Sequence, residues 1–293
     1  MKVLRINEQF QNFLFVIPAL FIFSFFYVIP FFYTFWLAFH SGSGVGEFNF
    51  VGIANFKKII FEDKLWWNSV GYSFYITLWA LTFQNVLAFM LALAVDKAIR
   101  TGNIYRVIFF LLPIISEIIF GLLIRKLLLY DPGVFNHLLE KMGLGRFTHD
   151  WLNDPHTALT CLAIAHCWRG FGWGFIILLA GLQTIPTQLY EVARIDGANA
   201  IQRFLKITLP LMVPVIFLVI ILTILGTVQV IGLPMALTRG GPAQKTTVAV
   251  YRIYNELSNY HLGYASTEGI VLGVILVTLS FTLLKISRRI KQD

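Results

Sequence analysis

The stretch EVARIDGANAIQRFLKITLP, residues 191–210, is the segment from which the organisation of the chain can be read. It is charged, it is interrupted by a glycine, and it lies between two long apolar runs. Ordinary connections between helices are shorter and carry less pattern. We therefore interpret it as about two short helices that form a docking segment, presented by the apolar helices on either side.

The composition of the whole chain places those flanking helices in a membrane. Of the 293 residues, 57% are hydrophobic and 13% are charged, and the mean hydropathy is +0.73. Soluble domains carry roughly 25% charged residues. Apolar runs of about 20 residues recur, which is the length that an α-helix needs to cross a bilayer. The runs are continuous rather than alternating, so the predicted fold class is an all-α integral membrane protein and not a β-barrel.

Six membrane-spanning helices are predicted. They cover residues 13–39, 70–95, 104–129, 158–182, 211–237 and 270–286. An even number puts both termini on one side of the membrane, and the basic tail KISRRIKQD favours the cytoplasmic side. The first run is too long for a signal-peptide core, so we expect it to be retained. No linker or repeat divides the chain, which predicts a single membrane domain over residues 1–293.

The charge and the cysteines point to no other class of partner. The formal charge of +8 is scattered over short loops and one tail, which does not indicate nucleic-acid binding. Such basic residues usually set membrane orientation and contact anionic lipid. Cys161 and Cys167 lie in one apolar run. Residues six apart do not face each other on a helix, so we expect no disulfide between them.

Residues 187–209 predict a helix, a glycine break and a second helix. Thr187 is placed to cap the amides of the first turn, and Gly197 is expected to end that helix with a positive φ. Small residues in the middle, ringed by charges, are typical of a modest protein interface with a polar rim. An amphipathic segment lying on the membrane surface explains the same composition equally well. The second helix has an apolar stripe at helical spacing, made by Ile201, Phe204 and Leu205.

The pattern of this segment resembles that of a known family. The chain reads Glu191-Val192-Ala193, then Asp196-Gly197-Ala198, then Phe204, Ile207 and Leu209-Pro210. It is similar to the signature cytoplasmic loop of permease subunits in binding-protein-dependent ABC importers, with Val192 in place of the usual alanine. Residues 168–170, 180–186 and 238–242 also look like the carbohydrate-import branch, which includes the maltose and glycerol-phosphate importers.

The resemblance implies a function, partners and a coupling surface. The implied function is ATP-driven import of a sugar, polyol or related glycoside across a prokaryotic plasma (inner) membrane. The implied partners are a second homologous permease subunit, two ATPase subunits and an extracytoplasmic solute-binding protein. Residues 187–209 would form a coupling helix that docks onto an ATPase subunit, with the contact carried by Glu191, Ala193, Asp196, Gly197 and Ala198.

The chain itself carries no pattern for ATP hydrolysis. The segment most similar to a phosphate-binding loop is residues 240–246. It lacks the glycine directly before Lys245 and does not join a strand to a helix. The sequence shows no metal cluster or nucleophile constellation, and His166 is interpreted as a packed histidine. We therefore expect no enzyme activity and no cofactor on this chain, with ATP and Mg²⁺ bound by the partner subunits.

Two charged residues are predicted to lie inside the membrane. Glu117 is roughly 18 Å from the inner boundary of the third span, and Arg169 is roughly 16 Å from the outer boundary of the fourth. In a hydrocarbon core of ~30 Å these depths are similar. Charges inside a membrane are costly and are usually paired. We therefore expect a Glu117–Arg169 ion pair, and we favour a structural role for it over direct substrate contact.

A sugar-binding cavity requires an aromatic platform and hydrogen-bonding groups. Trp173 in the fourth span is the candidate platform. Polar groups come from Arg169 in the same span and from Thr223, Thr227 and Gln229 in the fifth. Thr223 and Thr227 share one helix face. Packing of the tryptophan, and threonine hydroxyls that bond their own helix carbonyls, explain each residue singly just as well.

Two other function classes remain open on these grounds. An ion-coupled secondary transporter explains Glu117 but not the patterned segment 187–209. A membrane-embedded enzyme is disfavoured because the sequence contains no paired catalytic groups.

Overall fold

The computed structural model describes residues 8–42, 44, 46–96, 102–131 and 133–290. The chain forms two compact units, Met1–Asp63 with Ile253–Gly273 and Lys64–Arg252 with Val274–Asp293. The described residues are mostly helical and include one small two-stranded hairpin. This confirms the prediction of an all-α fold.

The first unit begins with a long apolar helix. It consists of α1 (Glu8–Phe23), the π-helical turn η1 (Ser24–Val28) and α2 (Ile29–Ala38). Pro30 is the second residue of α2, just after the π turn. Because proline has no amide hydrogen and its ring crowds the preceding turn, a locally wider turn is favoured there. The hairpin β1 (His40–Ser41) and β2 (Asn49–Phe50), the helix α3 (Ala54–Lys57) and the π turn η2 (Lys58–Glu62) follow.

Helix α15 (Leu262–Ile290) contributes its first residues to this unit and contacts the end of α2. Gly263 lies so close to the carbonyl oxygen of His40 that a side-chain carbon would overlap with it. The Thr267 hydroxyl lies 3.2 Å from the carbonyl oxygen of Ala38. Asn55 donates its amide hydrogens to the carbonyls of Ala38 and His40 at 3.0 and 3.1 Å. A glycine and two polar side chains therefore hold the helix ends together.

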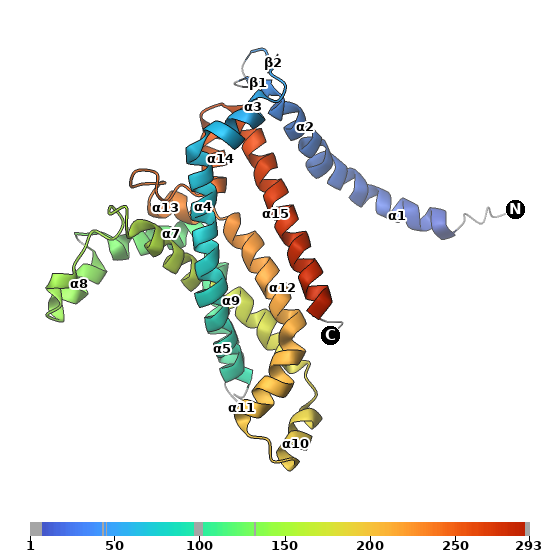
Figure 1. Ribbon diagram of the computed structural model, residues 1–293, viewed down its shortest axis with the longest axis vertical. Coiled ribbons are helices and arrows are strands. Elements are labelled where there is room, and N and C mark those ends of the chain that lie inside the picture. The colour runs from blue at the N-terminus through green and yellow to red at the C-terminus, as the bar shows by residue number, and fades with distance from the viewer. Residues whose placement is uncertain (1–7, 43, 45, 97–101, 132, 291–293) are drawn as a thin grey trace, which may run out of the picture. The chain divides into compact units, whose positions relative to one another are not determined.

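The second unit is built around α9 (Ala158–Gln183). Helices α4 (Lys64–Trp79) and α5 (Asn85–Asp96), joined by the π turn η3 (Ala80–Gln84), form one continuous rod. Helix α9 packs against this rod, against α6 (Gly102–Ile114) and against α12 (Leu209–Val228), as Figure 1 allows the reader to follow. The first residues of helix α14 (Ala249–Ser258), up to Arg252, and the end of α15 also belong to this unit.

Glycine residues on α9 allow the neighbouring helices to approach it closely. A side-chain carbon at Gly172 would overlap the backbone oxygen of Phe109 on α6, and one at Gly181 would lie 2.9 Å from Val215 on α12. Gly174 faces Ala88 on α5 at ordinary contact distance. Glycine and alanine at helix interfaces let backbones approach in a membrane, where packing rather than water drives association.

The number of spans agrees with the prediction only if one bent pair is counted as a single span. Within the described residues, five helices are long and apolar enough to cross a membrane, and six with that pair. The pair is the predicted third span, 104–129, in which α6 ends at Ile114 and α7 (Glu117–Leu128) continues at 92°. The prediction of one continuous helix was wrong here. Pro113 disturbs the last turn of α6, and Ser116 takes an extended conformation with φ −53° and ψ 137°.

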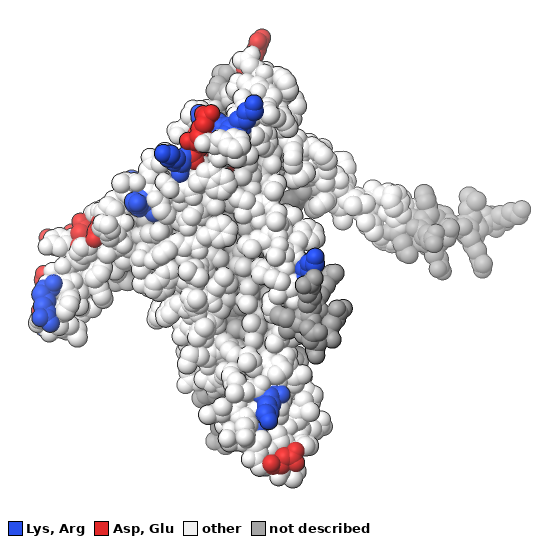
Figure 2. All heavy atoms as spheres, in the orientation of Figure 1, with Lys and Arg blue, Asp and Glu red and all other residues white. Residues whose placement is uncertain are grey.

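The predicted fifth span, 211–237, is also interrupted. Helix α12 ends at Val228, and the short helix α13 (Gly232–Leu237) follows and packs against α7. At its other end the helix begins earlier than predicted, because α11 (Ala200–Arg203) and the π turn η5 (Phe204–Thr208) lead directly into α12. Hydrophobicity marks where a helix enters the membrane but not where the helix itself begins. On the face drawn in Figure 2, the charged side chains lie toward the margins and the middle shows none.

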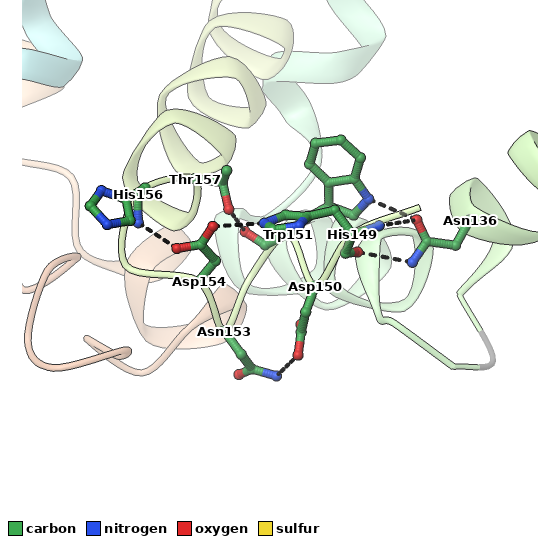
Figure 3. A network of polar contacts seen from close by, with 8 residues as sticks. All are labelled: Asn136, His149, Asp150, Trp151, Asn153, Asp154, His156 and Thr157. Carbon is green, nitrogen blue, oxygen red and sulfur yellow. Dashed lines mark hydrogen bonds and ion pairs between the residues drawn. The ribbon is translucent and has the colours of Figure 1, made fainter. Parts of the chain in front are cut away.

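A compact loop of residues 133–157, the α8 loop, connects α7 to α9. It contains α8 (Val134–Lys141) and the 3₁₀ turn η4 (Gly145–Phe147). Figure 3 shows its polar network, in which the indole of Trp151 donates to Asn136 at 2.8 Å. Hydrogen bonds from the backbone amide of His156 and from the ring of His149 lower the pKa of Asp154. The same His149 ring lies 2.7 Å from the Asp154 carboxylate.

Replacing Gly263 by alanine tests the close approach in the first unit. The added carbon would meet the backbone of His40, and overpacking of this kind costs about 1–3 kcal/mol. The matched control is Gly269→Ala in the same helix, where no atom lies within 4 Å of the new carbon. There alanine should be neutral or stabilise by up to about 1 kcal/mol. Thermal unfolding of the purified protein in detergent measures both, and equal midpoints for the two variants would contradict the packing described.

Candidate functional site

Residues 187–209 form two short helices joined by a tight turn. Helix α10 (Thr187–Ile195) is followed by Asp196 and by Gly197, whose φ is +77°. The amide of Ala198 donates to the carbonyl of Ala193 at 2.8 Å, and the amide of Gly197 donates to that of Arg194 at 3.1 Å. This pair of bonds is the Schellman arrangement, which needs a left-handed residue and therefore favours glycine. The predicted glycine break is present with the predicted sign of φ.

The caps of the two helices differ from the prediction. Thr187 does not cap α10: Pro186 occupies the cap position and no side chain bonds there. The fixed ring of Pro186 sets the entry angle instead. The second helix, α11, has a capping box that the sequence analysis missed. Asn199 accepts from the amide of Gln202 at 2.9 Å, and Gln202 accepts from that of Asn199 at 2.8 Å. The Asn-x-x-Gln spacing is the signal that would have indicated it.

The turn presents apolar side chains among charges. Glu191, Asp196 and Gly197 are exposed, and Ala193 and Ala198 are half-buried. Ile195, which was not among the residues singled out from the sequence, is 85% exposed, and Val192 and Ile201 are exposed beside it. Exposed aliphatic residues with a charged rim are typical of a docking surface.

The docking segment is attached firmly to the helices that follow it. The Tyr190 hydroxyl lies 2.9 Å from that of Thr208, which ties α10 to η5. A pocket of about 560 Å³ lies behind the segment, between α10, η5 and the end of α5, and Glu191, Arg194 and Arg203 are among its lining residues. Because η5 continues into α12, a displacement of α10 would be transmitted to α12.

A second cavity, of about 580 Å³, lies between η3, α7, α9 and α12. It is lined by five of the residues singled out from the sequence, Glu117, Arg169, Trp173, Thr223 and Thr227. Gln229, the sixth, follows the end of α12, is exposed and does not line this cavity. The structure thus gathers residues from the third, fourth and fifth spans around one volume large enough for a small ligand.

Arg169 and Glu117 meet at the edge of this cavity, where α6 and α7 separate. Arg169 Nη1 lies 3.2 Å from Glu117 Oε1. Arg169 also donates from Nε to the carbonyl of Ile115 at 3.1 Å and from Nη2 to that of Pro113 at 3.3 Å. The other carboxylate oxygen of Glu117 accepts the amide of Gly232, the first residue of α13, at 3.0 Å. The two side chains therefore satisfy backbone groups at both interruptions of the spans, which a membrane interior requires.

The threonines of α12 bond to other helices rather than to their own carbonyls. Thr223 donates to Asn85 Oδ1 on α5 at 3.0 Å. Thr227 lies 3.1 Å from Nε2 of His166 on α9. Trp173 is half exposed, and its ring meets Phe110 edge-on at 5.1 Å. Trp173 lines the cavity and is the candidate platform.

Two residues of the cavity wall were not predicted as site residues. Gln84 and His166 both line it and both are buried. The Oε1 atom of Gln84 is buried and has no hydrogen-bond partner among the described residues. A polar side chain in a long apolar run is the signal that would have indicated them. Cys161 and Cys167 are free thiols. Among the described residues, no group of three or more His, Cys, Asp or Glu side chains is placed to hold a metal ion.

Replacing Glu117 by glutamine tests the ion pair. Glutamine can still accept the Gly232 amide, but Arg169 loses its counter-charge in a partly buried site. Hydrogen bonds to charged groups contribute about 1.5–3 kcal/mol, so we expect the unfolding midpoint of the protein to fall. The control is Glu140→Gln on the exposed surface of α8. Thermal unfolding and complex assembly should be measured apart from transport, and unchanged values of all three would rule the pair out.

Comparisons with known proteins agree with this arrangement. The chain is 29% identical to the trehalose/maltose transport system permease protein MalF of Thermococcus litoralis, over 97% of this chain and 96% of that protein. It is 30% identical to the arabinooligosaccharides transport system permease protein AraP of Bacillus subtilis, over 98% and 91%. Its fold matches a chain of a bacterial ABC transporter involved in the import of the acidic polysaccharide alginate. That match has a TM-score of 0.80 at 23% identity and covers 95% of both chains.

A family model completes the comparison. The model of the binding-protein-dependent transport system inner membrane component matches residues 65–291, which include the docking segment and all residues of the cavity. Nothing in these findings supports the ion-coupled secondary transporter. The chain belongs to the family of binding-protein-dependent transport system inner membrane components, and it is a multi-pass permease subunit of an ABC importer rather than an enzyme.

Proposed function

We propose that this chain forms part of the path by which a sugar, polyol or related glycoside crosses a prokaryotic inner membrane. The whole chain, residues 1–293, acts as one permease domain with both termini in the cytoplasm. It pairs with a second, homologous permease subunit, and an extracytoplasmic solute-binding protein delivers the solute.

The observation that carries this proposal is the lining of the 580 Å³ cavity. Trp173 offers a flat apolar face, and Arg169, Thr223 and Thr227 offer donors and acceptors around it. Hydroxylated rings present apolar C–H faces and many hydroxyl groups, which suit such a wall. The names of the relatives MalF and AraP refer to trehalose/maltose and arabinooligosaccharides, which are ligands of this chemical class.

The energy is supplied by two separate ATPase subunits, which bind ATP and Mg²⁺ and contact residues 187–209. The contact is made by Glu191, Ala193, Asp196, Gly197 and Ala198, with the exposed Val192 and Ile195 beside them. Movement of this segment passes through η5 into α12, which carries Thr223 and Thr227. Alternating access then requires that ATP and the loaded binding protein favour different conformations.

Reconstitution of the complete transporter in liposomes tests the proposed function. Uptake of radiolabelled oligosaccharides should require ATP and the binding protein, and should persist when ionophores collapse all ion gradients. Uptake that follows an imposed proton or sodium gradient without ATP would overturn the proposal.

Replacing Gly197 by alanine tests the coupling role of the turn. The left-handed backbone conformation costs a residue with a side chain roughly 1–2 kcal/mol. Gly143 in the α8 loop is a matched control, since its φ is +75° and, as at Gly197, no atom lies within 4 Å of an added carbon. We expect Gly197→Ala to reduce co-purification of the ATPase subunits and transport-coupled ATP hydrolysis, and Gly143→Ala to leave both intact. Equal effects of the two variants would assign the result to backbone strain alone.

Replacing Trp173 by alanine tests the platform. One aromatic contact is worth about 0.5–1.5 kcal/mol, roughly a two- to tenfold change in affinity. We therefore expect a rise of that size in the sugar concentration that half-saturates uptake. Trp168→Ala is the matched control, because Trp168 lies on the same helix with 53% exposure against 54% for Trp173, and does not line the cavity. Identical kinetics of the two variants would remove Trp173 from the substrate site.

A further inference from the structure

The amphipathic helix α8 is turned with its apolar side outward. Val134, Leu138 and Met142 lie on successive turns of one face and are 49%, 51% and 70% exposed. Phe135 is exposed beside them. A helix surrounded by water normally buries such a stripe against its own protein.

The polar side of α8 is held inward by hydrogen bonds. Asn136 is 3% exposed. Its amide group donates to the carbonyls of Tyr130 and His149 at 3.2 and 3.0 Å, and it accepts the indole N–H of Trp151 at 2.8 Å (Figure 3). Rolling the helix to bury its apolar face would leave these groups unpaired, which is costly for buried polar atoms. The outward direction of the stripe is therefore built into the loop.

The helix that precedes α8 in the chain also exposes apolar side chains. Helix α8 packs against α7, whose Ile119, Leu123 and Leu127 are exposed. Residues 129–133 separate the two helices, so their ends lie within roughly 20 Å. Tyr130, which lies in this connection, is exposed, and tyrosine is enriched at the boundary between membrane and water. The other end of the α8 loop returns to Ala158, the first residue of the spanning helix α9.

We propose that Val134, Phe135, Leu138 and Met142, the α8 apolar face, bind the lipid bilayer at its headgroup boundary. This boundary lies at the end of α9 opposite residues 187–209. The apolar side chains enter the upper acyl region as those of interfacial helices do. Lys141, at the edge of the stripe, extends its ammonium group toward lipid phosphates. The contact holds the α8 loop, and through it the start of α9, at a constant depth.

Lipid fits this surface better than a protein partner does. A transient protein interface combines an apolar centre with a polar rim and hydrogen-bonding groups. Here Asn136, His137 and Glu140 line a cavity of about 650 Å³ together with Val134. Phe135, Leu138 and Met142 do not line this cavity, and their exposed apolar groups need no directional partner.

Fluorescence quenching in the reconstituted transporter tests the proposal. Single cysteines replace Leu138 or Met142, with His137→Cys as the control on the polar side of the same helix. The native thiols are removed by Cys161→Ala and Cys167→Ala, and the new thiol carries a small dye. In phosphatidylcholine–phosphatidylglycerol vesicles, lipids with acyl-chain nitroxides should quench positions 138 and 142 several-fold more than 137. Aqueous iodide should give the reverse order.

Two results would overturn the proposal. One is equal access of iodide to all three positions. The other is shielding of positions 138 and 142 that arises only when the binding protein is added, which would assign the face to that partner. ATP hydrolysis by each labelled complex serves as the control for assembly. If the background without native cysteines does not assemble, the variants are labelled in the natural chain and the signal of the parent protein is subtracted. Neither readout depends on which solute is imported or on the proposed sugar path.

Discussion

The structure depends on a constraint that the bilayer imposes on the backbone: every amide and carbonyl inside it needs a partner from the protein. Two predicted spans are interrupted, and each interruption frees such groups. Arg169 donates to the carbonyls of Pro113 and Ile115, and Glu117 accepts the amide of Gly232 while it pairs with Arg169. The two side chains of one ion pair therefore provide hydrogen-bond partners for backbone groups at both interruptions. The same pair borders the cavity, so the polar groups that permit the breaks also supply its charged wall.

Helix α9 connects this arrangement to the rest of the second unit. Its glycines let α6 and α12 approach closely, and without such contacts the side chains of different spans would not meet. Helix α9 is followed in the chain by the segment 187–209. A hydrogen bond between Tyr190 and Thr208 joins this segment to the start of α12. The segment is thus joined to the helix that carries Thr223 and Thr227 by chain continuity and by this hydrogen bond.

The candidate site was only partly predictable from the sequence. Glu117 and Arg169 could be matched because helical rise converts sequence position into membrane depth. Trp173, Thr223 and Thr227 stood out as polar or aromatic residues in apolar runs. Gln84 and His166 were not assigned, because their position beside the cavity depends on how the helices rotate against each other. Gln229 was misplaced for a related reason: the span was expected to continue, but α12 ends at Val228.

The sequence by itself determined the features that depend only on local free energies. Transfer of apolar residues from water marked the membrane helices, and the left-handed backbone at Gly197 marked the turn of the docking segment. The tertiary structure decided the bend between α6 and α7, the partners of Thr223 and Thr227, and the outward direction of the α8 stripe. The first two depend on which groups neighbouring helices bring within hydrogen-bonding distance, through packing between residues far apart in the chain. The third depends on the contacts of Asn136 with Tyr130, His149 and Trp151 in its own loop. The conformational preference of a single residue encodes none of these.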